Sequence, residues 1–283
     1  MASGDAVGIP LSPAPQHRAM LARPPRTREN RSPRRRDEGL TSRGYSSILL
    51  SMKVLDHAAH RRFKDELYQE FARLGQALAS PRRLEMLDLL AQRERSVEDL
   101  AQEMGLSIAN ASQHLRILAH ARLVETRREG TRVYYRLAGD QVFRLWQALR
   151  DVGEARLAEI ATIVQRYLGE RDQLEAIDAA ELLRRVEAGE VVLLDVRPLE
   201  EYRAGHIPGA RPVPPERLEQ ILQTLPRDRE IVAYCRGPFC IFSDEAVARL
   251  RQAGFAAHRL RLGLPDWRAL GLPVARGDTS DAA

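Results

Sequence analysis

Apolar positions at helical spacing dominate the middle of the chain, and the most informative run covers residues 107–122. One face of the helix predicted there is apolar: Ile108, Ala111, Leu115 and Leu118. Ser107 is a suitable N-cap for this helix. The opposite face presents side chains of the kind that contact base edges in DNA: Asn110, Gln113 and Arg116, with Ser112 and His114 at its flanks. An ordinary amphipathic surface helix has the same periodicity, so the neighbouring elements must decide between the two interpretations.

The elements before this helix complete a helix-turn-helix pattern. A stripe at spacings of three and four residues predicts a long first helix: Phe63, Leu67, Phe71, Leu74 and Leu78. Ser80 followed by Pro81 is the favoured order for the start of a second helix. Ser96 and Asp99 resemble a capping box that opens a short third helix, and Gly105 ends it with a tight turn. A helix, a glycine-containing turn and a further helix together predict a DNA-binding motif.

The residues after this motif predict a wing and a dimer. Two β-rich runs within residues 123–137 flank a charged turn centred on Glu129 and Gly130. Three arginines are placed to contact phosphate or to enter a minor groove: Arg127, Arg128 and Arg132. A further helix is predicted over residues 140–167, weakened in its middle by Gly153. One small winged domain cannot bury both this helix and the first one, so we expect a two-fold dimer that contacts two half-sites.

Four segments in order resemble the ArsR/SmtB family of bacterial repressors: residues 79–87, 100–107, 112–118 and 121–124. The resemblance implies a dimeric winged-helix repressor that a metal or a chemical signal releases from its operator. The sequence departs from the family's metal sensors, because residues 93–99 contain no cysteine and the last helix contains neither histidine nor cysteine. The pairs His57/His60 and His114/His120 have no obvious partners, so no metal site is predicted.

The C-terminal region, residues 178–277, has the pattern of an α/β domain. Residues 191–196 form a continuous apolar run, which is typical of a buried parallel strand. Residues 231–234 and 256–260 predict two more strands, and apolar positions within 246–250 predict the helix that links them. Strands that alternate with helices favour a doubly wound parallel sheet.

Cys235 directly follows the second of these strands, at the edge where such sheets bind ligands. The loop that continues through Arg236 and Gly237 leads into a helix. The backbone N–H groups of such a loop, together with a helix N-terminus, favour an anion, including a thiolate. A lowered thiol pKa would make Cys235 a nucleophile. The alternative is a thiol merely buried at the end of a strand.

The segments around this loop resemble the rhodanese family in the same order: residues 194–197, 200–202, 205–210, 234–236 and Trp267. The resemblance implies a sulfurtransferase. Its cysteine would take sulfane sulfur from a donor, hold it as a persulfide and pass it to a nucleophilic acceptor. It also implies that Asp195 and Arg197 brace the loop, whereas Glu201 and His206 are structural.

The loop departs from the rhodanese pattern at its end. Cys240 stands where rhodaneses commonly have an arginine that helps to bind an anionic donor, and Pro238 removes one N–H from the loop. Both changes argue against thiosulfate as the donor. Phosphatase chemistry is rejected, because it would need an arginine at the position of Ile241. Cys240 instead suggests a resolving thiol that attacks sulfur-loaded or oxidised Cys235, closing a disulfide and releasing the sulfur.

Length, charge and cysteine content limit the class of protein further. The 283 residues suffice for about two domains, and no apolar run reaches the roughly 18 residues of a membrane span. Two cysteines argue against a disulfide scaffold and fit the cytoplasm, a reducing compartment. Residues 1–50 hold nine arginines and four acidic residues, and this excess equals the whole formal net charge of +5. The basic pI therefore does not indicate that the folded part binds nucleic acid.

Residues 1–52 are rich in proline, serine and arginine without sustained periodicity, which predicts a disordered tail. Its arginines are able to contact phosphates nonspecifically. A transit peptide is an alternative, and a third hypothesis, which we favour, places the start of translation at Met52, because periodic sequence begins directly after it. A winged-helix domain would then cover residues 53–168, followed by a polar linker at 169–177.

Together these patterns predict two domains in a cytoplasmic homodimer: a winged helix-turn-helix and an α/β rhodanese-like parallel sheet. In the first interpretation the protein is a repressor that binds double-stranded DNA and detects sulfur or redox state through Cys235. Its small-molecule partners would be a sulfur donor and an acceptor, and no cofactor is expected. In the second interpretation it is primarily a sulfurtransferase enzyme, and the winged helix serves dimerisation or autoregulation.

Overall fold

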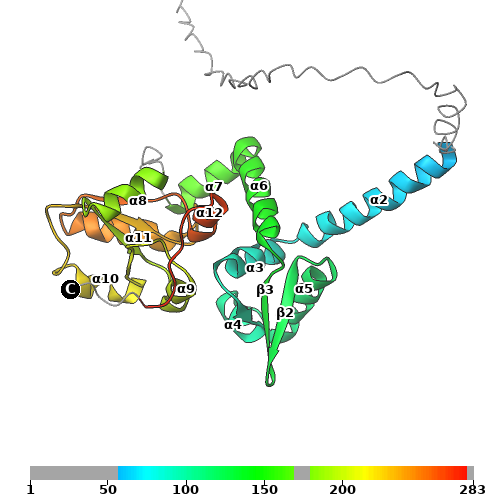
Figure 1. Cartoon of the computed structure of the whole chain (residues 1–283), viewed down its shortest axis with the longest axis horizontal. Helices are drawn as coiled ribbons and strands as arrows, with labels where there is room; N and C mark the ends of the chain where they lie inside the picture. The colour runs from blue at the N-terminus through cyan, green and yellow to red at the C-terminus, as the bar shows by residue number, and fades with distance from the viewer. Residues whose placement is uncertain (1–56, 169–178, 279–283) are drawn as a thin grey trace, which may run out of the picture. The chain divides into compact units, whose positions relative to one another are not determined.

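The computed structural model of the chain describes residues 57–168 and 179–278 (Figure 1). The predicted tail, the proposed start at Met52 and the linker at 169–177 lie outside these residues. The N-terminal part has nine elements: α2 (His57–Leu78), α3 (Pro81–Gln92), β1 (Arg95–Ser96), α4 (Val97–Glu103), α5 (Ile108–His120), β2 (Val124–Glu129), β3 (Arg132–Leu137), α6 (Asp140–Arg156) and α7 (Ala158–Leu168). The C-terminal part continues with α8 (Ala179–Glu187), β4 (Val191–Asp195), α9 (Leu199–Ala204), β5 (Arg211–Pro212), η1 (Pro215–Arg217), α10 (Leu218–Ile221), β6 (Glu230–Tyr234), α11 (Ile241–Gln252), β7 (Ala257–Arg259) and α12 (Leu264–Ala269).

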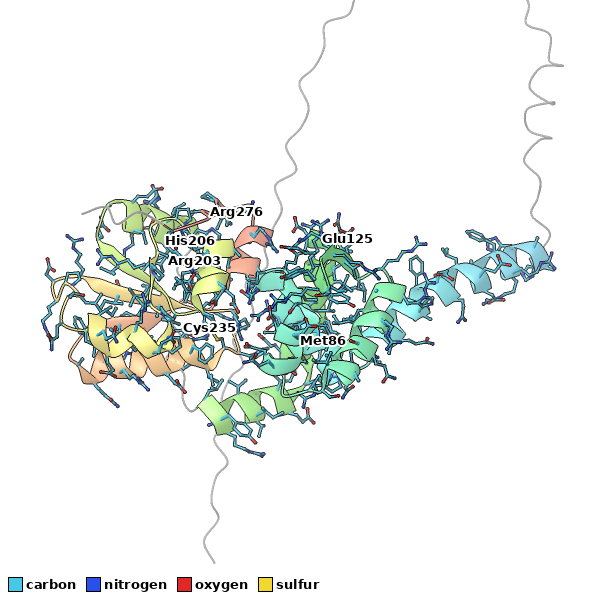
Figure 2. The ribbon with its side chains drawn as sticks, turned by 90° about the horizontal axis from the view of Figure 1, so that it is seen from below. Met86, Glu125, Arg203, His206, Cys235 and Arg276 are labelled. Carbon is cyan, nitrogen blue, oxygen red and sulfur yellow. A yellow bond between two sulfur atoms is a disulfide. The ribbon has the colours of Figure 1, made fainter. Side chains whose placement is uncertain are left out.

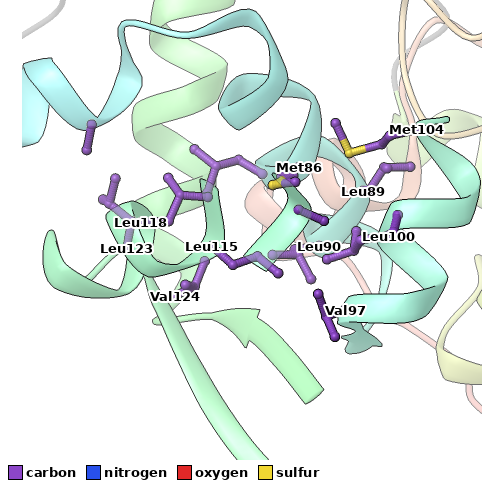
Figure 3. Packing of buried hydrophobic residues seen from close by; sticks show 14 of the residues in the cluster. Met86, Leu89, Leu90, Val97, Leu100, Met104, Leu115, Leu118, Leu123 and Val124 are labelled. Atoms are coloured by element: carbon purple, nitrogen blue, oxygen red, sulfur yellow. The ribbon is translucent and has the colours of Figure 1, made fainter. Parts of the chain in front are cut away.

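Helices α3, α4 and α5 pack around one apolar core, which Figure 3 shows from close by. Leu115 and Leu118 of α5 are fully buried in it, against Met86 of α3 and Leu100 of α4. The apolar stripe predicted for α5 is therefore confirmed, except at its first position. Ile108 is 53% exposed, because the first turn of α5 extends beyond this core. Because the apolar stripe is buried, the opposite, polar face of α5 points toward solvent.

The predicted caps set the start of each helix of the motif. The Ser96 hydroxyl accepts from the Asp99 backbone N–H (3.1 Å), and the Asp99 carboxylate accepts from the Ser96 backbone N–H (3.5 Å), which confirms the capping box. Gly105 has a φ of +62°, which favours glycine, and it makes the turn that follows α4. The Ser107 hydroxyl then accepts from the backbone N–H of Asn110 (3.3 Å) and caps α5.

Strands β2 and β3 form the predicted antiparallel wing, which extends beyond the neighbouring helices in Figure 1. Glu129 pairs with Arg132, so the turn consists of Gly130 and Thr131, one residue later than predicted. Gly130 has a φ of +60°. The short strand β1, which pairs with β3, was not predicted, because two residues are too few to show a pattern.

The helix predicted over residues 140–167 is two helices, and the expected weak point was wrong. The chain leaves helical geometry at Leu157 (φ −108°, ψ 98°), between α6 and α7. Gly153 lies inside α6 instead. A Cβ at Gly153 would lie 3.0 Å from the Ile160 side chain, so the glycine lets α7 fold back closely against α6.

The outer helices leave apolar side chains uncovered. Those with the largest exposed fractions on α2, α6 and α7 are Phe63, Tyr68, Phe71, Val152, Ile163 and Tyr167. Within the two described ranges, no helix is both long and apolar enough to cross a membrane. An uncovered apolar face of this kind is what a second copy of the chain would bury.

The C-terminal part is a parallel sheet of order β5-β4-β6-β7 with helices on both faces, as predicted, although β5 and the short helices α9, α10 and α12 were missed. Alternate residues of β4 point to opposite faces. Val191 and Leu193 join the core under α8 and α12, whereas Val192 and Leu194 join the core under α10 and α11. Two apolar cores, one on each face, explain why the strand has no polar alternation.

Candidate functional site

The two cysteines lie in one loop at the carboxyl end of β6, and their sulfur atoms are joined in a disulfide. Cys235 follows the last residue of β6 and is 1% exposed; Figure 2 labels it among the side chains of this sheet. Cys240 is the N-cap residue of α11 and is partly exposed. The second sulfur therefore does reach the first. In this disulfide form Cys235 is buried, so Cys240 is the sulfur that a reagent meets first.

Asp195 and Arg197, the predicted braces, are fully buried at the end of β4. Arg197 donates to the Asp195 carboxylate (2.5 Å) and to the carbonyl oxygen of Gly205 (2.7 Å). The Tyr234 hydroxyl donates to the same carboxylate (2.5 Å), and burial raises the pKa of Tyr234 well above its ordinary value. Burial alone would lower the pKa of Arg197, but the charge of Asp195 raises it. These contacts fix the end of β6, one residue before Cys235.

Arg236, the residue after Cys235, bridges two carboxylates from different parts of the chain. It donates to Glu201 of α9 (2.7 Å) and to Glu103 of α4, the first helix of the DNA-binding motif (2.7 Å). Glu201 is fully buried and also binds Arg95, which precedes α4. Burial opposes ionisation of Glu103, but the charge and the hydrogen bond of Arg236, together with the nearby charges of Arg95 and Arg93, lower the pKa of that carboxyl. Glu201 was expected to be structural, and its link to the loop and to the winged helix was missed.

Gln92, the last residue of α3, contacts the same loop through both atoms of its amide. Its Nε2 donates to the carbonyl oxygen of Arg236 (3.1 Å), and its Oε1 accepts from Arg197 (3.3 Å). The loop also packs against Gly263 of its own domain. A Cβ atom at position 263 would lie 2.1 Å from the Arg236 carbonyl oxygen, so only glycine fits there. The backbone of the thiol loop is therefore held by a winged-helix residue as well as by its own domain.

A cavity of about 300 Å³ lies beside the loop. Residues 236–242, which run from the loop through Cys240 into the first turn of α11, line one side. The other lining residues come from α3 and α6: Glu85, Asp88, Leu89, Trp146 and Arg150. The Trp146 indole N–H donates to the Asp88 carboxyl (3.0 Å), and burial raises the pKa of Asp88. Gly237 borders the cavity near Arg150: a Cβ there would lie 3.6 Å from the Arg150 Nη1 atom. No sequence pattern connected these helices to the thiol loop.

Helix α5 presents the predicted DNA-contacting residues as expected for a recognition helix. Those on its outer face are exposed: Asn110, Gln113 and Arg116. Ser112 and His114 are half-buried at its flanks, and Ser107 is used as the cap. Within residues 57–168 and 179–278, no cluster of three or more histidine, cysteine or acidic side chains is able to hold a metal ion.

The wing arginines differ in how much of their charge is free for DNA. Arg127 binds Glu94 (3.0 Å) and Glu129 (2.7 Å) and lies 4.7 Å from the centre of the Tyr134 ring. Side-chain hydrogen bonds to those two carboxylates raise its pKa. Arg128 and Arg132 are exposed, and neither forms an ion pair with a residue of the described ranges, although Arg132 has a side-chain hydrogen bond with Tyr134 that raises its pKa. Arg128 and Arg132 therefore suit phosphate better than Arg127 does.

Two protein-family models match the chain. The model described as a bacterial regulatory protein of the arsR family matches residues 80–126, which hold α3, α4 and α5. The model of the rhodanese-like domain matches residues 178–270, which hold the sheet and the thiol loop.

Individual proteins agree with both matches. The HTH-type transcriptional regulator Rv0324 of Mycobacterium tuberculosis is 50% identical over 214 residues, which cover 76% of this chain and 94% of that protein. A sulfurtransferase of Allochromatium vinosum is 34% identical over 100 residues, which cover 35% of this chain and 92% of that protein. A solved fragment from Mycobacterium bovis is 49% identical, and the match covers 33% of this chain and 87% of the fragment, with a TM-score of 0.32. It is described as the homodimeric winged helix-turn-helix DNA-binding domain of a possible ArsR-family regulator. The 50% identical regulator, 94% of which this chain covers, and the two family models show that the chain belongs to the ArsR-type helix-turn-helix transcriptional regulators and carries a rhodanese-like domain in its C-terminal half.

Proposed function

We propose that this regulator is a cytoplasmic homodimeric repressor whose affinity for its operator is set by the chemical state of Cys235 and Cys240. One observation carries the proposal. The loop that holds both sulfurs is bonded through Arg236 to Glu103, on the first helix of the DNA-binding motif. A change in the loop therefore has a direct contact through which to act on the helices that bind DNA.

The DNA-binding half of the proposal rests on α5 and the wing. The exposed amides of Asn110 and Gln113 have the donor and acceptor atoms that recognise adenine in a major groove. Arg128 and Arg132 would bind phosphate. The uncovered apolar faces of α2 and α6 would be buried in a two-fold dimer, which would place two recognition helices on two half-sites.

The chemistry proceeds by thiol–disulfide exchange. The Cys235 thiolate attacks the terminal sulfur of a hydropersulfide RSSH, the S–S bond breaks, and the thiolate RS⁻ leaves, so that Cys235 carries a persulfide. The Cys240 thiolate then attacks the Sγ atom of Cys235, the bond between that atom and the outer sulfur breaks, and hydrosulfide leaves. The protein thiols are oxidised to the disulfide, and the transferred sulfur is reduced to sulfide. The disulfide in the structure is the end point of this sequence.

The test measures intact mass and operator affinity on the same reduced sample, before and after treatment with a hydropersulfide donor. We expect a gain of one sulfur, or the loss of two hydrogens, together with a matching change in DNA affinity. Full conversion of the cysteines with unchanged affinity would contradict the proposal.

A second candidate function is favoured by the rhodanese-like match and by the sulfurtransferase relative. In it the protein transfers sulfane sulfur catalytically, and the winged helix serves dimerisation or autoregulation. Multiple turnovers of sulfur from donor to acceptor, at a rate that operator DNA does not change, would favour this function over the first.

Substituting the recognition helix tests the DNA-binding face. Gln113→Ala is expected to lower affinity for the operator by about 1–3 kcal/mol and to leave affinity for random DNA nearly unchanged, because it removes a base contact. Titration of both DNAs with fluorescence anisotropy measures the difference. Gln102→Ala, on the exposed surface of α4, is the matched control. An equal loss on both DNAs would mean that Gln113 does not face the bases.

The wing is tested by its salt dependence. Arg128→Ala is expected to weaken binding to operator and random DNA alike, and to reduce the slope of log K against log salt by about 0.9, the value for one phosphate contact. Arg127→Ala should change the slope less, since two carboxylates already neutralise that side chain. If the two substitutions give the same slope, the assignment of roles within the wing is wrong.

A further inference from the structure

The cavity beside the thiol loop has an unusual wall, because the winged-helix part supplies about half of it. Leu89 of α3 and Trp146 of α6 line it together with Phe239 of the loop and Phe242 of α11. Cys240 lines the same cavity, whereas Cys235 is buried behind it. A small molecule that opens the disulfide from this cavity therefore reaches the Cys240 sulfur.

Arg150 gives this cavity a polar group in need of a partner. Its side chain is only 8% exposed, and one terminal nitrogen binds the Asp266 carboxylate (2.5 Å). Its Nε atom is buried and has no hydrogen-bond partner among the described residues. A carboxylate oxygen of Asp151 lies 3.9 Å from that nitrogen, beyond hydrogen-bond distance. A buried cationic N–H without an acceptor is costly. A ligand in the cavity that supplies an oxygen anion would pair with this guanidinium through Nη1, which lies beside Gly237 of the thiol loop.

The other charged groups of the cavity do not oppose an anion strongly. Arg236 is a cation, although Glu201 and Glu103 already pair with it. Asp88 is held by the indole of Trp146, and burial favours its neutral form. Glu85, which also lines the cavity, is exposed and is paired with Arg82 (3.0 Å). The remaining wall is largely apolar and aromatic. The cavity thus combines one unsatisfied cationic donor, a short apolar path and an accessible disulfide sulfur.

We propose that this cavity is the binding site for the small thiol that exchanges with the Cys235–Cys240 pair, and that the thiol carries a carboxylate which Arg150 binds. The inference rests on the proposed thiol chemistry of the pair, but not on any effect on DNA. The bound thiolate attacks the Cys240 sulfur, a mixed disulfide forms, and the Cys235 thiolate leaves. A second thiolate then attacks the sulfur of the first, which releases the small disulfide and the Cys240 thiolate. Two small thiols are oxidised and the protein disulfide is reduced.

The site has a consequence for regulation. Its ligand touches α3 and α6 as well as the loop, so exchange chemistry takes place in contact with the DNA-binding part. Any preference of the ligand for one arrangement of these helices would be coupled reciprocally to DNA affinity.

The experiment compares two thiols of equal length, 3-mercaptopropionate and 3-mercapto-1-propanol, as reductants of the full-length disulfide form. Opening is followed by intact mass after rapid alkylation. Each rate is divided by the rate of the same thiol with bis(2-hydroxyethyl) disulfide, which cancels the intrinsic nucleophilicity of the thiol. We expect the carboxylate thiol to be about tenfold faster after this correction, and Arg150→Gln to remove the difference. Arg144→Gln, an exposed residue of the same helix, is the matched control and should preserve it.

A second measurement uses the wild-type protein, so it does not depend on whether the Arg150→Gln variant folds. Propionate, which has the carboxylate but no thiol, should slow opening of the wild-type disulfide by 3-mercaptopropionate, whereas 1-propanol should not. Equal corrected rates for the two thiols, or no inhibition by propionate, would overturn the proposal. If the preference is present but reduction leaves operator affinity unchanged, the site stands and the proposed regulatory function fails.

Discussion

Replacing Cys235 with serine is expected to abolish sulfur loading and, with it, any response of operator affinity to a hydropersulfide donor. The serine hydroxyl is nearly isosteric with the thiol in its buried position, so the fold and the untreated DNA affinity should persist. It cannot form a sulfur–sulfur bond, which removes both the persulfide and the disulfide. Intact mass and anisotropy titrations before and after treatment measure the two effects.

The matched variant Cys240→Ser separates the two oxidised forms. It retains the nucleophile, so one added sulfur should appear in the mass, but the disulfide is unable to close. A response of DNA affinity in this variant would assign the signal to the persulfide, and its loss would assign the signal to the disulfide. If the Cys235→Ser protein still responded to the donor, the sensing group would lie elsewhere in the chain.

Glu201→Gln is expected to give the largest loss of stability, roughly 3 kcal/mol. Glu201 is fully buried and binds the guanidinium groups of Arg95, itself 4% side-chain exposed, and Arg236. Removing its charge leaves two largely buried cations with less compensation, and breaking a buried ion pair is far costlier than breaking an exposed one. The value is at the low end for such changes, because the amide oxygen still accepts a hydrogen bond.

Urea unfolding tests this expectation, and the chain provides convenient probes. The two tryptophans lie in different parts, Trp146 in α6 and Trp267 in α12, so fluorescence follows both. Glu219→Gln removes an exposed ion pair with Arg249 and should change the free energy of unfolding by less than about 0.5 kcal/mol. Equal midpoints for the two variants would show that the buried network contributes little.

Local patterns were sufficient for most elements of the fold. The caps at Ser96 and Ser107, the stripe on α5 and the apolar runs of β4 and β6 each depend on residues close in sequence, and each was predicted. The misses have a common cause. β1 and β5 have two residues each, too few for periodicity, and their place is decided by the strand beside them. The break between α6 and α7 was assigned to the intrinsic weakness of Gly153, although tertiary packing uses that glycine for close approach.

The candidate site, too, was predicted only where its residues lie close together in the sequence. Cys235 and Cys240 were found because a strand end, a loop and a helix start are recognisable in one short segment. The residues that contact the loop were not predicted. Gln92, Glu103 and Arg150 lie on helices far from the loop in sequence, and no local sequence pattern marks them. A single sequence does not reveal that two distant residues form an ion pair, as Arg95 and Glu201 do.

That ion pair limits how the two halves of this chain could be exchanged with those of other proteins. A chimera that joins this rhodanese-like half to a foreign winged helix keeps Glu201 buried but loses the cation that Arg95 supplies. The reverse chimera keeps Arg95 and loses its anion. A functional chimera would have to transfer Gln92, Arg95 and Glu103 together. The pairing of the two domains therefore depends on the residues at their contact surface as well as on the linker.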